Sequence, residues 1–251
     1  MHYLPLTLDS PAENLALDEA LLDAHEAGEI AGGVLRLWEA PSHAVVLGRS
    51  SAANTEVNLD ACQQDHVPVL RRCSGGGTIV AGPGCLMYAV VLDFDTNPQL
   101  RAVDLAHDFV LGQLTQALIP LLPDIAKAGT SDLVLAPKSS GSTAQKFSGN
   151  ALRIKRNHLL YHGTLLYDFD LNQATRLLGS PTRQPDYRLE RRHAQFITNL
   201  PATRAALEQV LIKVWNANAP LNSLPQDRIT EILRTKYAAD TNWTIFNPAS
   251  L

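Results

Sequence analysis

The spacing of apolar and polar positions predicts several helices along the chain. Residues 13–22 have the period of an amphipathic helix, and Asp9 or Ser10 followed by Pro11 is typical of an N-terminal cap. Residues 105–122 are long and apolar enough for a buried helix. From about residue 206 to 251 the pattern is again mainly helical, with a break at two prolines.

Short apolar runs bounded by turn residues predict strands between these helices. The predicted strands are residues 34–38, 44–47, 67–72, 86–92, 132–135, 151–155 and 158–167. The first two flank the turn residues 40–42, which predicts that they pair. Arg156 and Asn157 join the last two into a hairpin. The pattern predicts an α+β fold with a mixed or antiparallel central sheet flanked by helices, in one domain over residues 1–251.

Composition excludes several classes of protein. The 251 residues are 45% hydrophobic and 18% charged with a formal charge of −4, which favours neither disorder nor binding to nucleic acid. No run approaches the roughly 20 apolar residues that span a membrane, and the N-terminus lacks a signal-peptide pattern, so a cytoplasmic protein without membrane contact is expected. Three cysteines without paired spacing predict neither a disulfide framework nor a structural metal site.

A glycine-rich segment is the strongest local sign of chemistry. Three consecutive glycines, residues 75–77, lie between predicted strands and directly after Arg71 and Arg72. Glycine lets the backbone pass close to a ligand and turn its N–H groups toward an anion, for which the arginines supply matching charge. The segment has neither a P-loop nor a dinucleotide-binding spacing. By itself it is compatible with an anion-binding loop or a plain tight turn.

A second polar segment, residues 145–151, places Lys146 beside the flexible pair Ser148 and Gly149, at the start of the predicted hairpin. A lysine there can hold a carboxylate or phosphate and neutralise the charge that develops on oxygen during acyl transfer. A solvated loop lysine is the alternative interpretation of the same residue.

In combination, these segments resemble a known family. The chain is similar, from about residue 14 to 243, to the lipoate-protein ligases and their octanoyltransferase relatives, whose catalytic domain has the biotin-protein ligase fold. The motifs that carry the resemblance are residues 14–19, 35–38, 46–49, 71–77, 129–133, 146–151 and 162–166. Each motif is modest alone, and their order over most of the chain makes the resemblance specific.

The resemblance implies ATP-dependent attachment of lipoate or octanoate to a lysine of a lipoyl carrier domain, through an acyl-adenylate. Lys146 would be catalytic and contact the acyl carbonyl and the α-phosphate, and Asp132 would lie near ribose, phosphate or Mg²⁺. The other expected substrate-binding residues are Arg72, Ser74, Gly75, Gly76, Gly77, Thr78, Ser148, Gly149, Asn150, Ala151, His162 and Gly163. Apolar residues around 45–47 and 79–80 would line an acyl channel. The carrier would be a 2-oxoacid dehydrogenase subunit or a glycine-cleavage H-like protein.

The chain departs from the ligase pattern in three places. Residues 81–85 replace the His and Asp that family ligases carry after the glycine loop, and they look more like the corresponding octanoyltransferase segment. Residues 136–144 form an extra polar loop, interpreted as a lid over the adenylate or as a neutral surface insertion. The accessory domain of many bacterial ligases is expected to be absent, so a separate accessory-domain protein is a candidate partner.

Two other functions stay open at this point. Transferases of this class hold the acyl group on a cysteine, and residues 124–131 contain none, which leaves Cys73 and Cys85 as displaced nucleophiles or as small buried thiols. A non-catalytic lipoate-binding protein is the second alternative. His162 is interpreted as an orienting hydrogen-bond partner. His193 lies in a basic stretch, interpreted as a solvated face that could dock an acidic carrier.

Overall fold

The computed structural model describes residues 1–137, 139, 141–179, 184–238 and 241–248. The helices are α1 (Pro11–Glu26), α2 (Ala53–Glu56), α3 (Leu59–Gln64), α4 (Val103–Leu118), α5 (Leu171–Leu177), α6 (His193–Phe196), α7 (Arg204–Val214) and α8 (Gln226–Ile232), with 3-10 helices at Pro98–Arg101 and Asp186–Arg188 and a π-helix at Leu233–Tyr237. The strands are β1 (His2–Pro5), β2 (Val34–Trp38), β3 (Ala44–Leu47), β4 (Val69–Arg71), β5 (Ile79–Ala81), β6 (Cys85–Asp93), β7 (Ile125–Ala128), β8 (Asp132–Leu135), β9 (Gln145–Ile154), β10 (His158–Leu166), β11 (Ala219–Pro220) and β12 (Thr244–Phe246).

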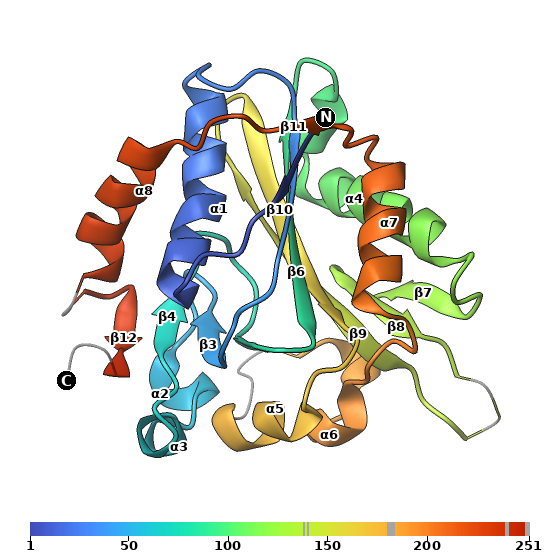
Figure 1. The fold of residues 1–251 in the computed structure, drawn as a ribbon. Helices are drawn as coiled ribbons and strands as arrows, with labels where there is room; N and C mark the ends of the chain where they lie inside the picture. Colours follow the sequence, from blue (N-terminus) through green and yellow to red (C-terminus); the bar gives the residue numbers. More distant parts are fainter. Residues whose placement is uncertain (138, 140, 180–183, 239–240, 249–251) are drawn as a thin grey trace.

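Within the described residues, the strands form a large and a small sheet. The large sheet has the order β11-β1-β2-β6-β10-β9-β8-β7, and the small sheet has the order β12-β4-β3-β5 (Figure 1). The pairs β2–β6, β6–β10, β10–β9 and β9–β8 are antiparallel, whereas β1 pairs parallel with β2 and β11. The α+β class with a mixed, mainly antiparallel central sheet is therefore confirmed.

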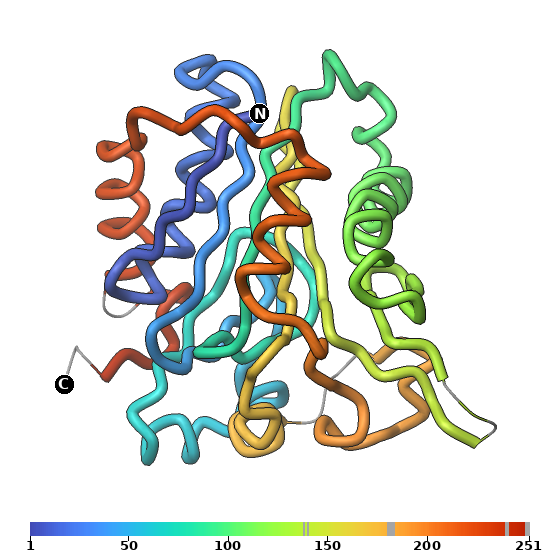
Figure 2. Tube along the Cα trace, turned by 45° about the vertical axis from the view of Figure 1, so that its right-hand side comes forward, coloured from blue at the N-terminus to red at the C-terminus, as the bar shows by residue number. Residues whose placement is uncertain are grey.

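Each face of the large sheet supports its own apolar core. Alternate residues of a strand point to opposite faces. On β6, Tyr88 and Val90 belong to the core under α4 and α7. Ala89 and Val91 belong to the core that includes α1 and the small sheet. Figures 1 and 2 show α1 on one side of the large sheet and the pair α4 and α7 on the other.

The prediction that residues 34–38 and 44–47 pair with one another is wrong, although both are strands. β2 pairs with β1 and β6 in the large sheet, whereas β3 pairs with β4 and β5 in the small sheet. The turn residues 40–42 between the two strands predict a change of chain direction, but they do not determine which strand each one pairs with. The predicted hairpin is confirmed, but its first strand begins at Gln145, so Lys146 lies in β9 rather than in a loop.

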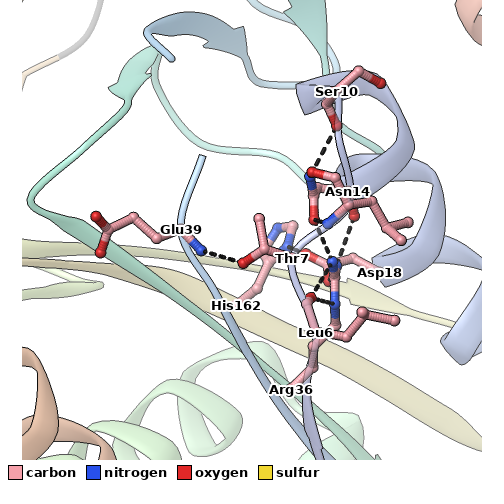
Figure 3. Close-up of polar contacts among 9 residues, drawn as sticks. Leu6, Thr7, Ser10, Asn14, Asp18, Arg36, Glu39 and His162 are labelled. Carbon is pink, nitrogen blue, oxygen red and sulfur yellow. Dashed lines mark hydrogen bonds and ion pairs between the residues drawn. The ribbon is translucent and has the colours of Figure 1, made fainter. Parts of the chain in front are cut away.

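The N-terminal helix contributes one partner of a buried ion pair that its apolar pattern does not predict. Ser10 caps α1 in a capping box with Glu13, as the sequence predicts. One turn further on, the carboxylate of Asp18 lies 2.5 Å from the guanidinium of Arg36 on β2. Both side chains are almost fully buried. Asn14 accepts a second hydrogen bond from Arg36, so this cluster ties α1 to the large sheet (Figure 3).

The C-terminal segment packs on the small sheet. β12 pairs with β4, and the hydroxyl of Tyr237 donates to the carbonyl of Arg71 at 2.8 Å. The helices predicted beyond residue 206 are present as α7 and α8, although residues 239–240 and 249–251 of this segment lie outside the described residues. In the described part of the chain, no helix is both long and apolar enough to cross a membrane.

Candidate active site

A cavity of about 440 Å³ lies where the two sheets approach one another, and β3, β5, β6, β9, β10, α5 and α6 all contribute to its wall. The apolar lining residues include Leu15, Val46, Ile79, Val80, Met87, Leu166, Phe169, Ala174, Leu178, Phe196 and Ile197. The polar lining residues include Thr130, Ser131, Asp132, Lys146, Ser148, Asn150, Gln184, Arg188 and His193. Such a cavity suits a ligand with an apolar tail and a polar, charged head.

Lys146 projects into this cavity because of a bulge in β9. The pairing of β8 with β9 shifts register between Leu133 and Val134, and a bulge of this kind re-aims the neighbouring side chains. The ammonium nitrogen of Lys146 lies 2.8 Å from the Asp132 carboxylate. The lysine passes over Gly149, where an added Cβ would lie 2.7 Å from that nitrogen. A side chain at position 149 would therefore displace the end of Lys146 from this position.

The carboxylate of Asp132 is held from two sides. Its Oδ1 pairs with Lys146, and its Oδ2 accepts a hydrogen bond of 2.7 Å from the hydroxyl of Tyr187. Burial and the charge of Asp132 raise the pKa of Tyr187, so this hydroxyl stays a donor. Tyr187 lies 55 residues from Asp132 in the chain, and no local sequence pattern predicts their contact.

The glycine segment forms a loop whose shape is set by Arg72. The Nε atom of Arg72 donates to the Ser74 hydroxyl at 3.0 Å, and Nη2 donates to the carbonyl oxygens of Gly75 and Gly77 at 2.6 and 2.9 Å. Nη1 donates to the carbonyl of Val46 at 3.2 Å. Burial lowers the pKa of Arg72 to about 10, so the guanidinium stays charged at neutral pH. Arg72 lines the cavity and also shapes the loop.

Close backbone contacts explain the glycines of this loop. Gly76 has a φ of 85°, which is unfavourable for other residues. A Cβ on Gly48 would lie 1.9 Å from the carbonyl oxygen of Gly76. Among the described residues, the amides of Gly75, Gly76 and Gly77 donate no hydrogen bond. Of these three residues, Gly76 and Gly77 line the cavity, and their contact with an anion stays a prediction.

Ser74 and His162 link this loop to the buried ion pair. The hydroxyl of Ser74 lies 2.5 Å from Nε2 of His162. Nδ1 of the same ring is 3.6 Å from Oδ2 of Asp18. His162 lines the cavity, so the chain of contacts extends from Arg36 in the core to the ligand space (Figure 3).

The structure brings most of the expected binding residues together. Those that line the cavity are Arg72, Gly76, Gly77, Thr78, Asp132, Lys146, Ser148, Gly149, Asn150, Ala151, His162 and Gly163. Ser74 and Gly75 are not in the lining. Gly163 lets β10 approach Asn150, because a Cβ there would lie 1.9 Å from its Oδ1 atom. Of the extra loop 136–144, residues 138 and 140 lie outside the described residues.

The two candidate thiols lie outside the cavity lining. Cys73 is 5% exposed and Cys85 is fully buried. Burial raises the pKa of both thiols, and the charge of Glu19 raises that of Cys73 further, so both stay protonated at neutral pH. The Cys85 sulfur contacts that of Met87 at 3.8 Å. This environment favours the small buried thiol among the interpretations.

Arg188 and His193 line the cavity, whereas the sequence analysis assigned their stretch to a solvated face. That interpretation of His193 is wrong. Burial, followed by the charges of Arg188 and Lys146, lowers the pKa of His193 to about 4. The basic composition of residues 188–193 signalled solvent exposure, and only the tertiary structure turns two of these side chains inward.

The fold and the cavity define an α+β domain with one cavity that combines apolar lining residues with several cationic ones. The profile of the lipoyl protein ligase A/B catalytic domain family matches residues 10–213, and the chain belongs to this family. It is an enzyme domain of the lipoate-protein ligase type.

Several known proteins are similar to the chain. A candidate lipoate-protein ligase A from Aeropyrum pernix is 29% identical over 214 residues, which are 85% of this chain and 74% of that protein. One from Schizosaccharomyces pombe is 31% identical over 69% of this chain, which spans only 43% of that relative. An octanoyltransferase from Brevibacillus brevis is 23% identical over 97% of this chain and 98% of its own length.

Solved structures share the fold. A crystal structure of lipoate-protein ligase A bound with ATP superposes with a TM-score of 0.76 at 19% identity, covering 96% of this chain and 97% of the other. The ligase of a bipartite archaeal lipoylation system from Thermoplasma acidophilum, described together with its E2 lipoyl domain, gives a TM-score of 0.72 at 19% identity, covering 95% and 94%.

Proposed function

We propose that the chain attaches lipoate or octanoate to a lysine of a lipoyl carrier domain, in two steps through an acyl-adenylate formed from ATP. The observation that carries this proposal is that Lys146 lines the same cavity as a set of apolar side chains and as the polar groups of Asp132, Ser148 and Asn150. An acyl chain against the apolar side chains would bring its carboxylate to this lysine. The nucleotide would lie against the polar groups.

In the first step, a carboxylate oxygen of the acid attacks the α-phosphorus of ATP, and the bond to the β-phosphate oxygen breaks with release of pyrophosphate. In the second step, the carrier amine attacks the acyl carbonyl, AMP leaves and the amine loses a proton. Both steps build negative charge on oxygen near Lys146. A fixed cation and the amides of residues 75–77 stabilise that charge more in the transition state than in the ground state.

Asp132 prepares Lys146 for this role. The carboxylate holds the lysine at 2.8 Å, while Tyr187 supplies a second donor to the same carboxylate. When a phosphate arrives, Lys146 can turn to it and Asp132 keeps the bond from Tyr187. The lysine is thereby held within the cavity instead of sampling solvent.

Mg²⁺ would accompany ATP as part of the substrate. The described residues contain no group of three or more metal-ligand side chains. Mg²⁺ commonly binds phosphate oxygens with only one or two protein carboxylates, and Asp132 is the carboxylate in the described lining of this cavity. The site fits a metal delivered by the nucleotide and held by Asp132.

The partner we propose is a lipoyl domain of a 2-oxoacid dehydrogenase or a glycine-cleavage H-like protein. The archaeal neighbour described with its E2 lipoyl domain supports this class of partner. Because that ligase is bipartite, a separate accessory-domain protein is a further candidate for the adenylation step. Residues 1–251 would then be the catalytic unit that binds acid, nucleotide and carrier.

The test is to incubate the pure protein with ATP, Mg²⁺, lipoate and an apo lipoyl domain, and to weigh the carrier by mass spectrometry. A parallel reaction supplies lipoyl-AMP in place of ATP and lipoate. The wild type is expected to add one lipoyl group in both reactions, and Lys146→Ala to lose at least 100-fold in rate in both. Transfer from lipoyl-AMP alone would show that adenylation needs a second chain.

Absence of transfer in both reactions would refute the ligase proposal. The octanoyltransferase relative from Brevibacillus brevis makes transfer from an octanoyl carrier protein the second candidate. Cys73→Ser and Cys85→Ser variants separate the two, because only a thioester route requires a thiol. Binding of lipoate without any transfer would instead support a non-catalytic binder.

A further inference from the structure

The turn from Asp186 to Arg191 is tightly built beside the cavity. The two arginines Arg188 and Arg191 brace it reciprocally, since the Nε atom of each donates to the carbonyl of the other at 3.0 and 2.9 Å. Between them, Leu189 and Glu190 adopt left-handed backbone conformations with φ of 52° and 56°. Non-glycine residues keep such conformations where the surrounding contacts over-determine them, commonly at ligand clamps.

This turn directs Arg188 into the cavity. Its side chain is 7% exposed, and the guanidinium stacks 4.8 Å from the ring of Phe196. Its terminal nitrogens, Nη1 and Nη2, donate no hydrogen bond to any described residue, and the ion pairs among these residues do not include Arg188. Burial lowers the pKa of Arg188, and the charge of the neighbouring Glu190 offsets only part of that effect. A phosphate would supply a counter-charge inside the cavity.

His193 lies beside this guanidinium and also lacks a hydrogen bond from its ring to the described residues. α6 is fixed against β9, because the amide of Thr198 donates to the carbonyl of Lys146 at 2.9 Å. Asp132 is the one carboxylate among the described lining residues, and it already pairs with Lys146. Among the described lining residues, the cations Arg72, Lys146 and Arg188 therefore outnumber the single carboxylate, and Glu190 acts on Arg188 from outside the lining.

We propose that Arg188 and His193 form a subsite for the two terminal phosphates of ATP, which leave together as pyrophosphate. The inference rests on the proposed function, in which Lys146 faces the α-phosphate. Leu189 and Glu190, which follow Arg188 in the chain, are exposed, so this part of the turn lies at the protein surface. When the bond from the α-phosphorus breaks, its electron pair passes to the β-phosphate oxygen. A planar guanidinium matches that growing charge with two parallel donors.

The test measures binding directly, so it does not depend on turnover. Isothermal titration of the pure chain with magnesium pyrophosphate and, separately, with AMP would compare the wild type with Arg188→Gln, Arg188→Lys and His193→Gln. Arg192→Gln is the matched control, because this exposed neighbour is outside the cavity lining. Arg188→Gln is expected to weaken pyrophosphate binding at least tenfold, Arg188→Lys less and His193→Gln about threefold. AMP affinity should change less than twofold.

Equal pyrophosphate affinity in the wild type and Arg188→Gln would overturn the subsite, and so would a wild type that binds no pyrophosphate. An equal loss of AMP and pyrophosphate affinity would also overturn it, because Arg188 would then only shape the cavity. Circular dichroism and urea denaturation check that each variant remains folded. Failure of the ligase proposal would appear elsewhere, as absent lipoyl transfer with the pyrophosphate affinities as expected.

Discussion

Replacement of Asp18 by asparagine should destabilise the fold by about 3 kcal/mol. Arg36 is fully buried, and Asp18 supplies the only ion pair to it among the described residues. The asparagine is nearly isosteric and keeps one acceptor, but it removes the negative charge. Removal of one partner of a buried ion pair costs about 3–5 kcal/mol. The retained hydrogen bond places the expectation at the lower end of this range.

The effect has a defined pH dependence. Burial acts on the Asp18 carboxyl to raise its pKa, but the ion pair with Arg36 and the contact with His162 outweigh it, and the net pKa is lowered. A lowered carboxyl pKa contributes stability that is present above the ordinary value, near 4, and is lost as the pH falls through the folded value. The difference between wild type and Asp18→Asn should therefore be constant near neutral pH and narrow below about pH 4.

Urea denaturation at pH 7 measures the effect as a shift of the midpoint with an unchanged slope. Asp108→Asn is the control, since Asp108 is 59% exposed in its pair with Lys127 and should change stability by less than about 0.5 kcal/mol. A change below about 1 kcal/mol in Asp18→Asn, or one no larger than in the control, would refute the assigned role of the buried pair.

Three further predictions follow from individual contacts. From pH 7.5 to pH 5, the wild type should lose about 1 kcal/mol of unfolding free energy relative to His193→Gln. The unfolded wild type binds a proton at His193 below about pH 6.5, whereas the folded wild type does not, because the pKa of His193 is about 4. An equal difference between the two urea midpoints at both pH values would contradict this prediction. Gly48→Ala should weaken lipoate binding at least tenfold by displacing the loop at Gly76, and unchanged affinity in titration calorimetry would exclude the clash. Gly112→Ala has open space around its Cβ in α4, so it should stabilise the folded protein by about 0.5–1 kcal/mol, which scanning calorimetry measures. Cys73→Ser with Cys85→Ser should leave transfer from lipoyl-AMP within about threefold, and a loss beyond 100-fold would restore the thioester route.

The sequence by itself determined the elements whose signal is local. Strand periods at 34–38, 44–47 and 132–135 match the observed strands, and the cap at Ser10 and the hairpin at 156–157 form as expected. Turn, cap and alternation signals depend on residues near in the chain, so they can be identified without knowing the fold. The motifs around Arg72 and Lys146 also lie together in the cavity, as their order in the resembling family implied.

Only the tertiary structure decided which distant groups meet. It separates the strands β2 and β3 into two sheets and buries Arg36 against Asp18, although arginine usually signals exposure. It also brings Tyr187 to Asp132 and turns Arg188 and His193 into the cavity. These contacts join residues far apart in the chain, and their energies depend on burial and charge that no local pattern contains. The sequence therefore indicated the cavity's chemistry, and long-range packing selected the residues that complete it.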